Sequence, residues 1–167
     1  PNGLGNDSGV LGHYIMAHNY RVRARATYDG MEDSYYYGRR PNGVYMPRFR
    51  NFGNDAQLNF KRGYALACAS YRQGWQRDNG TEGIGADLKD NLTEPGSWVF
   101  FATAMGEMLP YKDNRVWLDK DKKDEWGIPM LHTHVTWHEN EDAMAKDAVE
   151  QMALMFEKAG LKNIQSE

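Results

Sequence analysis

One apolar stretch organises the chain, and it reads Trp98-Val99-Phe100-Phe101-Ala102-Thr103-Ala104-Met105-Gly106-Glu107-Met108-Leu109. Aromatic and β-branched residues at its start, Gly106 inside it and Pro110 after it favour a strand over a buried helix. Both alternating faces are apolar, which is typical of a central strand that is covered on both sides. The sequence therefore predicts a central strand over residues 98–109.

Glu107 is the exception in this strand, because it places a carboxylate on the face that also carries Phe101 and Met105. A buried charge is costly unless it is paired, hydrogen-bonded or neutralised. Two interpretations are open. Glu107 is either a structural carboxylate, paired with an arginine or solvated at the strand end, or a carboxylate that orients a base near a reaction centre. Nothing in the chain clearly supplies that base.

Other strands are expected on both sides of this stretch. Residues 20–28 alternate between a polar and an apolar face, as a half-buried strand does. Residues 44–51 form another, in which Pro47 indicates an edge position or a bulge. Residues 59–76 are interpreted as a strand, although the alanines leave a helix open. Its small face is expected to admit close packing of a helix, and consists of Gly63, Ala65, Ala67 and Ala69.

The last element is a helix that begins near Asn140, which can cap it, and ends at Gly160. Its apolar stripe recurs at three- and four-residue spacing and contains Met144, Ala148, Met152, Met155, Phe156 and Ala159. A short helix is expected around Ala86–Asn91, and further strands over residues 116–119 and 128–137. Together the elements predict a single α+β domain over residues 1–167, with a mostly antiparallel sheet and helices on one face.

Composition excludes several classes of protein. The 167 residues include 20 Lys and Arg against 23 Asp and Glu, and this net charge of −3 argues against a dedicated nucleic-acid binder. No apolar run approaches the roughly 20 residues that span a bilayer, and no signal-like start is present. The single cysteine, Cys68, rules out an internal disulfide framework and lies between alanines, where we expect an inert thiol. The compartment is left open.

Three histidines lie close together in the sequence. His132 and His134 fall on one face of the strand expected over residues 128–137, and His138 follows it. Neutral imidazoles are good metal ligands, which raises a metal hypothesis. No HExxH spacing accompanies them, however, and the simpler interpretation is that they line a polar sheet face or an interface. We expect no metal site.

Several short motifs, taken together, resemble one enzyme family. Asp7-Ser8-Gly9-Val10-Leu11-Gly12-His13-Tyr14-Ile15-Met16-Ala17-His18 resembles the SSG-x-x-G-x-x-(L/I)-M-D-H stretch of the glucose–methanol–choline (GMC) flavin oxidoreductases, in their sugar and polyol dehydrogenase branch. Gly106 through Asp119 matches the pattern E-x-x-P-x-x-x-N-R-V-x-L of that branch. The remaining matches are Pro47–Asn51, Arg62–Tyr64, Trp126–Pro129, Asn140-Glu141 and Ala159-Gly160. Ala17 departs from the family, which usually has Asp before the histidine.

The resemblance implies a function for a larger protein. It implies that this chain is the substrate-binding domain of an FAD-dependent enzyme that oxidises CH–OH groups of sugars or other alcohols. The flavin domain and the C-terminal stretch with the catalytic histidine would lie outside the chain, so the fragment alone is predicted to be inactive and to bind no FAD. By resemblance, Glu107 would support the absent catalytic histidine, and Phe101, Met105 and Glu107 would face the flavin or the substrate.

A different class of function stays open beside this one. A free-standing module could bind a carbohydrate or an aromatic ligand through Tyr35–Tyr37 and exposed tryptophans, because aromatic rings stack on sugars. If the chain is instead a fragment, we expect it to expose an apolar face that normally meets the flavin domain, and to hide that face by dimerisation.

Overall fold

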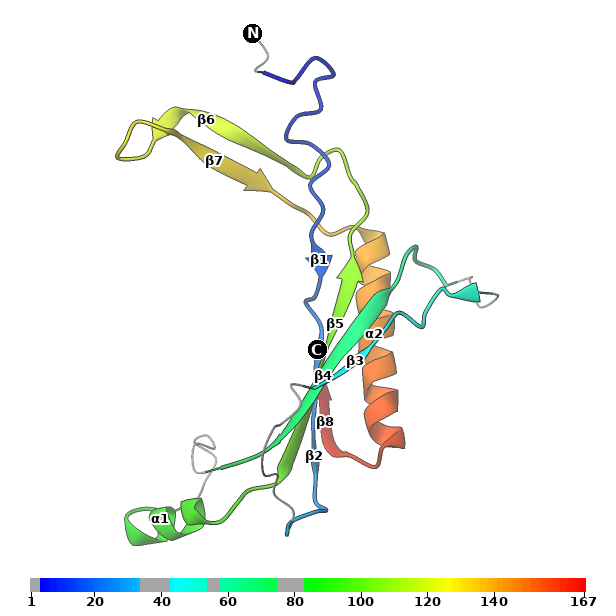
Figure 1. Ribbon diagram of the computed structural model, residues 1–167, viewed down its shortest axis with the longest axis vertical. Helices are drawn as coiled ribbons and strands as arrows, with labels where there is room; N and C mark the ends of the chain where they lie inside the picture. The colour runs from blue at the N-terminus through cyan, green and yellow to red at the C-terminus, as the bar shows by residue number, and fades with distance from the viewer. Residues whose placement is uncertain (1–3, 34–42, 54–57, 75–82) are drawn as a thin grey trace.

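Two antiparallel sheets and two helices make up the described part of the computed structural model, which covers residues 4–33, 43–53, 58–74 and 83–167 (Figure 1). In chain order the elements are β1 (His18–Asn19), β2 (Arg23–Tyr28), β3 (Val44–Met46), β4 (Tyr64–Arg72), α1 (Ala86–Thr93), β5 (Trp98–Glu107), β6 (Arg115–Lys123), β7 (Pro129–His134), α2 (Glu139–Lys158) and β8 (Lys162–Ser166). The predicted α+β class with a mostly antiparallel sheet is confirmed.

The central position of β5 is also confirmed. The larger sheet has the order β3-β4-β5-β2-β8, and β1 pairs with the far end of β5. β5 ends at Glu107, two residues earlier than predicted. The reason is that the backbone N–H of Leu109 donates to the carboxylate of Glu141 at 3.0 Å, and Pro110 follows.

α2 covers one face of this sheet, and its predicted apolar stripe is confirmed. Met144, Ala148 and Met152 are buried together with apolar side chains of β2, β4 and β5. Gly106 permits this close approach, because a Cβ atom there would lie 2.5 Å from the Sδ atom of Met144. α1, close to the short helix predicted from the sequence, has no buried residue and lies at the far end of the molecule (Figure 1).

The other face of the sheet carries no helix, so the prediction that β5 is covered on both sides is wrong for the described residues. Phe101 is 41% exposed and Met105 is 38% exposed. On the face of β5 toward α2, the small residues Ala102, Ala104 and Gly106 leave room for the large side chains of the helix. The face opposite α2 is therefore partly exposed from Phe101 to Glu107, whereas Val99 at its other end is buried.

The face of β4 that was expected to receive a helix is the wrong one. Tyr64 and Leu66 pack under α2, whereas Ala67 is exposed on the opposite side. Tyr64 also donates its hydroxyl hydrogen to Asp147 of α2 at 2.6 Å, and burial together with this bond raises the pKa of Tyr64. Large side chains fill the space below the helix better than alanines do, which explains the choice of face.

The strands predicted over residues 20–28 and 44–51 are both present but shorter, because β2 begins at Arg23 and β3 ends at Met46. β2 buries Ala24 and Ala26 and exposes its arginines, as its alternation indicates. β3 is an edge strand that stops directly before Pro47. Tyr35–Tyr37, which the alternative binding module would use, lie outside the described residues. Neither helix in the described ranges is long and apolar enough to cross a membrane.

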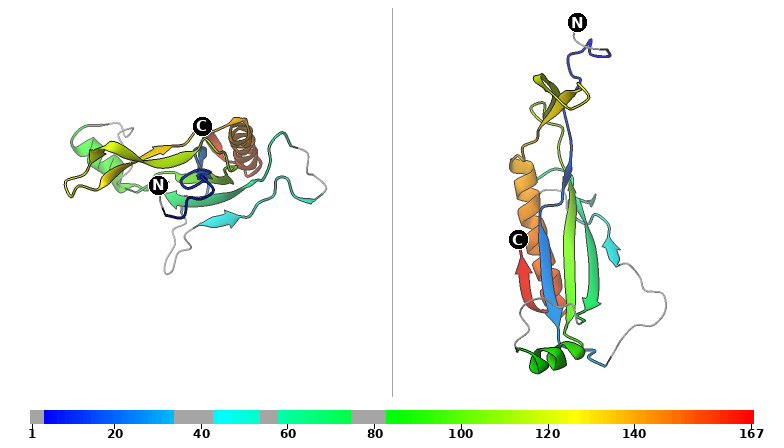
Figure 2. Two further views of the ribbon diagram at one scale, coloured as in Figure 1. Left: turned by 90° about the horizontal axis from the view of Figure 1, so that it is seen from above. Right: turned by 90° about the vertical axis from the view of Figure 1, so that its left-hand side faces the viewer.

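β6 and β7 form a hairpin that projects from one end of the molecule. In Figure 1 the hairpin and α1 extend from opposite ends toward the same side, away from α2, and Figure 2 shows β4, β5 and β2 side by side between them. Across the hairpin, Trp117 stacks on His132 with the ring centroids 5.3 Å apart, and His132 Nε2 lies 2.5 Å from the Asp119 carboxylate.

The stability of this hairpin is expected to fall in acid through Asp119. The hydrogen bond with His132, followed by those from the backbone N–H groups of Asp121 and Lys122, lowers the pKa of Asp119 from 3.8 to about 2. A pKa below the unfolded-state value means that the ionised carboxylate stabilises the folded state above pH 3.8, and that this contribution is lost as the pH falls toward 2. An NMR titration of the Asp119 carboxyl carbon measures this pKa, and a midpoint near 3.8 would contradict the prediction.

Candidate functional site on the open face of the sheet

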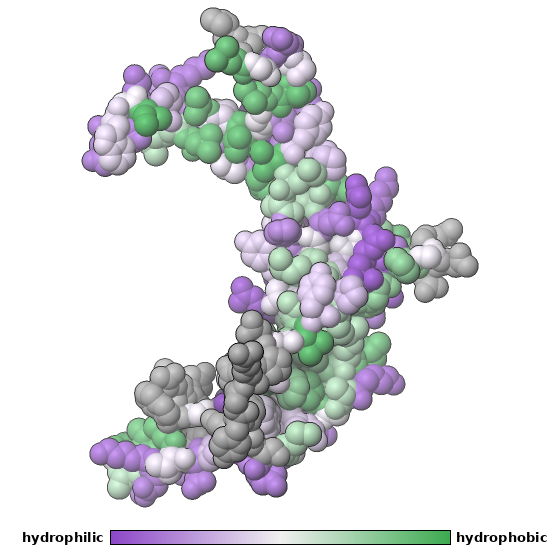
Figure 3. Space-filling model, in the orientation of Figure 1, coloured by the Kyte–Doolittle hydropathy of each residue, from purple (hydrophilic) through white to green (hydrophobic). Residues whose placement is uncertain are grey.

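The open face is the face of the larger sheet opposite α2. Strand register places on it Arg23 and Arg25 of β2, Ala67 and Ala69 of β4, and Phe101, Thr103, Met105 and Glu107 of β5. The side chains of the alanines are small, whereas those of the residues of β5 and β2 on this face are larger and extend further from the sheet. The hairpin and α1 project toward this side, and the outline of the molecule is hollowed there (Figure 3).

The three predicted site residues lie together on this face. Phe101, Met105 and Glu107 alternate along β5, so their side chains point to the same side. Glu107 is not a buried charge, because 54% of its side chain is exposed, and Arg62 Nε lies 3.8 Å from its Oε2 atom. The open face has no covering layer at this strand end, which explains the exposure. The described contacts match the interpretation of a carboxylate near an arginine, and the catalytic role stays a prediction.

His18 is a neighbour of Glu107 that sequence reasoning did not bring to this site. β1 pairs with β5 so that His18 lies opposite Glu107, and both side chains are exposed. Directly paired residues on one face of an antiparallel sheet have Cβ atoms about 4.5–5.5 Å apart. The open face therefore presents an imidazole and a carboxylate side by side. Only the pairing of residues far apart in the sequence reveals this.

The buried carboxylate of this structure is Glu141, which is completely inaccessible. It accepts hydrogen bonds from the backbone N–H groups of Leu109 and His138, at 3.0 and 3.2 Å. The side chains of Asn140 and Tyr111 donate to it as well, at 3.1 and 3.4 Å. Its position in the first turn of α2 adds a favourable interaction with the helix dipole.

Glu141 also has a detectable effect on Tyr111. Burial, followed by the hydrogen bond to the Glu141 carboxylate, raises the pKa of Tyr111 to about 12. A signal for the buried acid exists in the sequence, because Glu141 stands three residues after the helix-capping position, as in a capping box. The prediction that Asn140 caps the helix is wrong, because the capping position is His138 and the helix begins at Glu139.

The family-like motifs meet near this acid. Asn114 is completely buried, and its side chain pairs with the backbone of Thr136 through bonds of 2.8 and 3.2 Å. The backbone carbonyl of Asn114 accepts a hydrogen bond from the backbone N–H of Ile15 at 2.9 Å. Gly12 has a φ of +83°, and a Cβ there would lie 2.4 Å from the carbonyl oxygen of Val116. These motif residues therefore join the N-terminal segment to the base of the hairpin.

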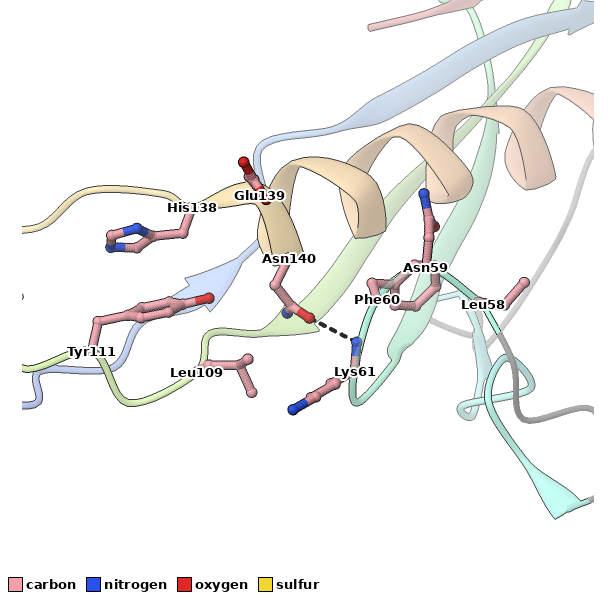
Figure 4. A pocket seen from close by; sticks show the side chains of 9 residues that line it. All are labelled: Leu58, Asn59, Phe60, Lys61, Leu109, Tyr111, His138, Glu139 and Asn140. Carbon is pink, nitrogen blue, oxygen red and sulfur yellow. Dashed lines mark hydrogen bonds between the residues drawn. The ribbon is translucent and has the colours of Figure 1, made fainter.

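A hollow beside the N-terminus of α2 is lined by the loop before β4 and by the residues after β5 (Figure 4). Tyr111 and His138 lie at one end, with ring centroids 3.8 Å apart, and Leu58 lies at the other. The backbone N–H of Lys61 donates to Asn140 Oδ1 at 2.7 Å. This bond joins the loop to the helix, whereas the buried Nε2 atom of His138 has no hydrogen-bond partner among the described residues.

The three neighbouring histidines have separate partners. His132 bonds Asp119, His134 Nε2 lies 3.3 Å from the Thr136 hydroxyl, and His138 Nε2 lies 3.5 Å from Asp113. No group of three His, Cys, Asp or Glu side chains with metal-binding geometry occurs within the described ranges. Burial raises the pKa of the Cys68 thiol, which keeps it protonated and less nucleophilic.

Comparison with known proteins finds a sequence similarity to a dehydrogenase. A protein named 2-methyl-1,2-propanediol dehydrogenase, from Mycolicibacterium austroafricanum, is 27% identical to the chain over 157 residues. The chain is similar to a diol dehydrogenase. The similarity spans 91% of this chain but only 28% of that protein, and no family model matches the chain.

This similarity supports a relationship to oxidoreductases that act on an alcohol. It extends over nearly the whole chain, so it includes both the sheet with its open face and the junction around Glu141. The narrower GMC resemblance, the FAD dependence and the roles of Phe101, Met105 and Glu107 stay predictions.

Proposed function

We propose that this chain is the substrate-binding domain of an FAD-dependent oxidoreductase that acts on CH–OH groups of sugars or other alcohols. The observation that carries the proposal is the open face, where Glu107 lies among apolar residues on the hollowed side of the molecule. Similarity to a diol dehydrogenase of which the chain spans only 28% supports a substrate-binding part within a larger enzyme.

The residues of the chain offer contacts for the planar ring of FAD but no motif for its pyrophosphate. The sequence contains no G-x-G-x-x-G dinucleotide fingerprint, so it supplies no motif of that kind for the pyrophosphate. Phe101 and Met105 offer apolar contacts on the open face for a planar ring or a substrate. FAD, when bound, supplies the acceptor for the hydride of the alcohol carbon.

In this proposal the residues of the chain bind and orient, and a base outside the chain removes the hydroxyl proton. Phe101 and Met105 exclude water from the substrate side. Glu107, with Arg62 at 3.8 Å and His18 across the strand, accepts a hydrogen bond from the base or the substrate and holds it in position.

The proposal is tested on the complete protein, expressed with whatever sequence surrounds this chain in its gene. We expect the purified protein to carry the visible absorbance of bound flavin and to reduce a dye when a sugar, a polyol or a diol is added. A complete protein without flavin, or one that oxidises none of these alcohols, would contradict the proposal.

A further inference from the structure

Another hollow lies at the base of the β6–β7 hairpin, where the N-terminal segment passes beside β6 (Figure 1). Its volume is ≈ 560 Å³, within the range of about 300–1,000 Å³ that is usual for sites of small ligands. It is lined by His13, Lys112, Asp113, Arg115, Trp117 and His134. None of these residues belongs to the open face, so this hollow is a separate candidate for a ligand site.

Strand pairing places three of these side chains in one row. Arg115 lies opposite His13 of the N-terminal segment in an antiparallel bridge, and opposite His134 of β7 on its other side. Directly paired residues of antiparallel strands share a face and have Cβ atoms about 4.5–5.5 Å apart. The guanidinium group of Arg115 therefore has an imidazole ring on each side.

The donor atoms of this row are only partly used within the chain. His13 Nδ1 lies 2.8 Å from the backbone carbonyl oxygen of Lys112, which can only accept, so Nδ1 carries a hydrogen and Nε2 is left for a ligand. The Cζ atom of Arg115 lies 4.9 Å from the centroid of the Trp117 ring. This contact uses the face of the guanidinium group, whereas its N–H groups lie in the plane and can bind a ligand.

The charges around the hollow favour an anion with two negative charges. Arg115 and Lys112 bring two permanent positive charges, and neither forms an ion pair within the described ranges. Asp113 is the one acid of the lining, and its Oδ2 atom lies 3.5 Å from His138 Nε2. The cations and imidazoles come from the N-terminal segment, the turn after β5 and both strands of the hairpin. A tetrahedral phosphate presents oxygens to several sides, whereas a carboxylate presents two in one plane.

We propose that the hollow at the base of the hairpin binds the phosphate group of a small organic phosphate. Arg115 binds two phosphate oxygens through its fork of N–H groups, and Lys112 neutralises the remaining charge. His13 and His134 contact the phosphate from the two sides of Arg115, and Trp117 packs against the carbon part of the ligand. The bound phosphate connects the N-terminal segment to both strands of the hairpin. This inference does not depend on the proposed function.

The test is a calorimetric titration of the complete protein with phenyl phosphate and, as the matched carboxylate, with benzoate. Neither probe carries an alcohol that the enzyme could oxidise, so the result is independent of its reaction. We expect phenyl phosphate to bind at least about tenfold more tightly than benzoate, because the second negative charge meets a second cation. Bound phenyl phosphate should also raise the urea midpoint of unfolding by mass action, and added salt should weaken its binding.

Arg115→Met should weaken the binding of phenyl phosphate by about tenfold or more, since it removes a charge-assisted pair of hydrogen bonds. The matched control is Arg48→Met, because Arg48 also lies over an aromatic ring, that of Phe52, but outside the hollow. Its affinity for phenyl phosphate should equal that of the wild type. Lys112→Met changes an exposed side chain in the turn after β5, and should weaken binding even if Arg115→Met does not fold.

Three results would overturn the inference. Benzoate could bind as tightly as phenyl phosphate, which would remove the assignment to a phosphate. Arg115→Met and Lys112→Met could both bind phenyl phosphate as tightly as Arg48→Met does, which would place the ligand elsewhere. Inorganic phosphate could bind more tightly than phenyl phosphate, which would show that the ligand is the free ion and not an organic phosphate.

Discussion

Replacing Glu141 by alanine is expected to lower the free energy of unfolding by about 3–4 kcal/mol, because it leaves several buried donors without an acceptor. The donors come from three places, namely Leu109 after β5, Tyr111 beyond it and the start of α2. The substitution therefore removes the hydrogen bonds that connect the sheet, the base of the hairpin and the helix. Urea unfolding of wild type and variant under identical conditions measures the difference.

Glu139→Ala is the control for this substitution. Glu139 lies in the same first turn of α2 but is exposed, so the same change of side chain should alter the stability by no more than about 0.5 kcal/mol. Equal losses for the two variants would show that the helix dipole, and not the buried hydrogen bonds, accounts for the effect of Glu141.

Replacing Glu107 by glutamine is expected to act on turnover and not on folding. Its side chain is 54% exposed and has one distant arginine neighbour, so the stability should change by less than about 0.5 kcal/mol. If Glu107 orients or tunes a base, kcat of the complete enzyme should fall by about 10–100-fold, as for other groups that support a reacting residue. Steady-state kinetics across the pH range should also show a displaced pH profile.

Glu125→Gln provides the comparison for Glu107, since it removes an exposed carboxylate from the connection between β6 and β7 and leaves β5 unchanged. Unchanged turnover and an unchanged pH profile in Glu107→Gln would show that the carboxylate has no part in the reaction. A loss of stability as large as that expected for Glu141 would show that its role is structural.

Sequence patterns were sufficient to predict the helices and strands, but not which face of the sheet packs against α2. The strand around Phe101 and the helix around Met152 follow from local periodicity, which depends on neighbouring residues. The covered face of β4 did not follow, because Ala65 and Ala67 suggest close packing as readily as Leu66 suggests a core. Which face meets α2 depends on the volume left between sheet and helix, and a linear pattern does not contain that volume.

The candidate site was predictable in part for a similar reason. Alternation alone places Phe101, Met105 and Glu107 on one face, and the structure agrees. It does not say which of two acids is buried, and the buried one is Glu141. Nor does it pair His18 with Glu107, because that pairing joins strands far apart in the sequence.

The place of β2 between β5 and β8 has a consequence for the order of folding. Residues 23–28 pair with residues 98–103 and with residues 162–166, so both partners of β2 are synthesised long after it. Until then its apolar residues Ala24 and Ala26 have no sheet to join. Pairing over such separations is slow, because a long loop must close before any contact forms. We therefore expect the β6–β7 hairpin and α2, which are local, to form early, and the insertion of β2 to limit the folding rate.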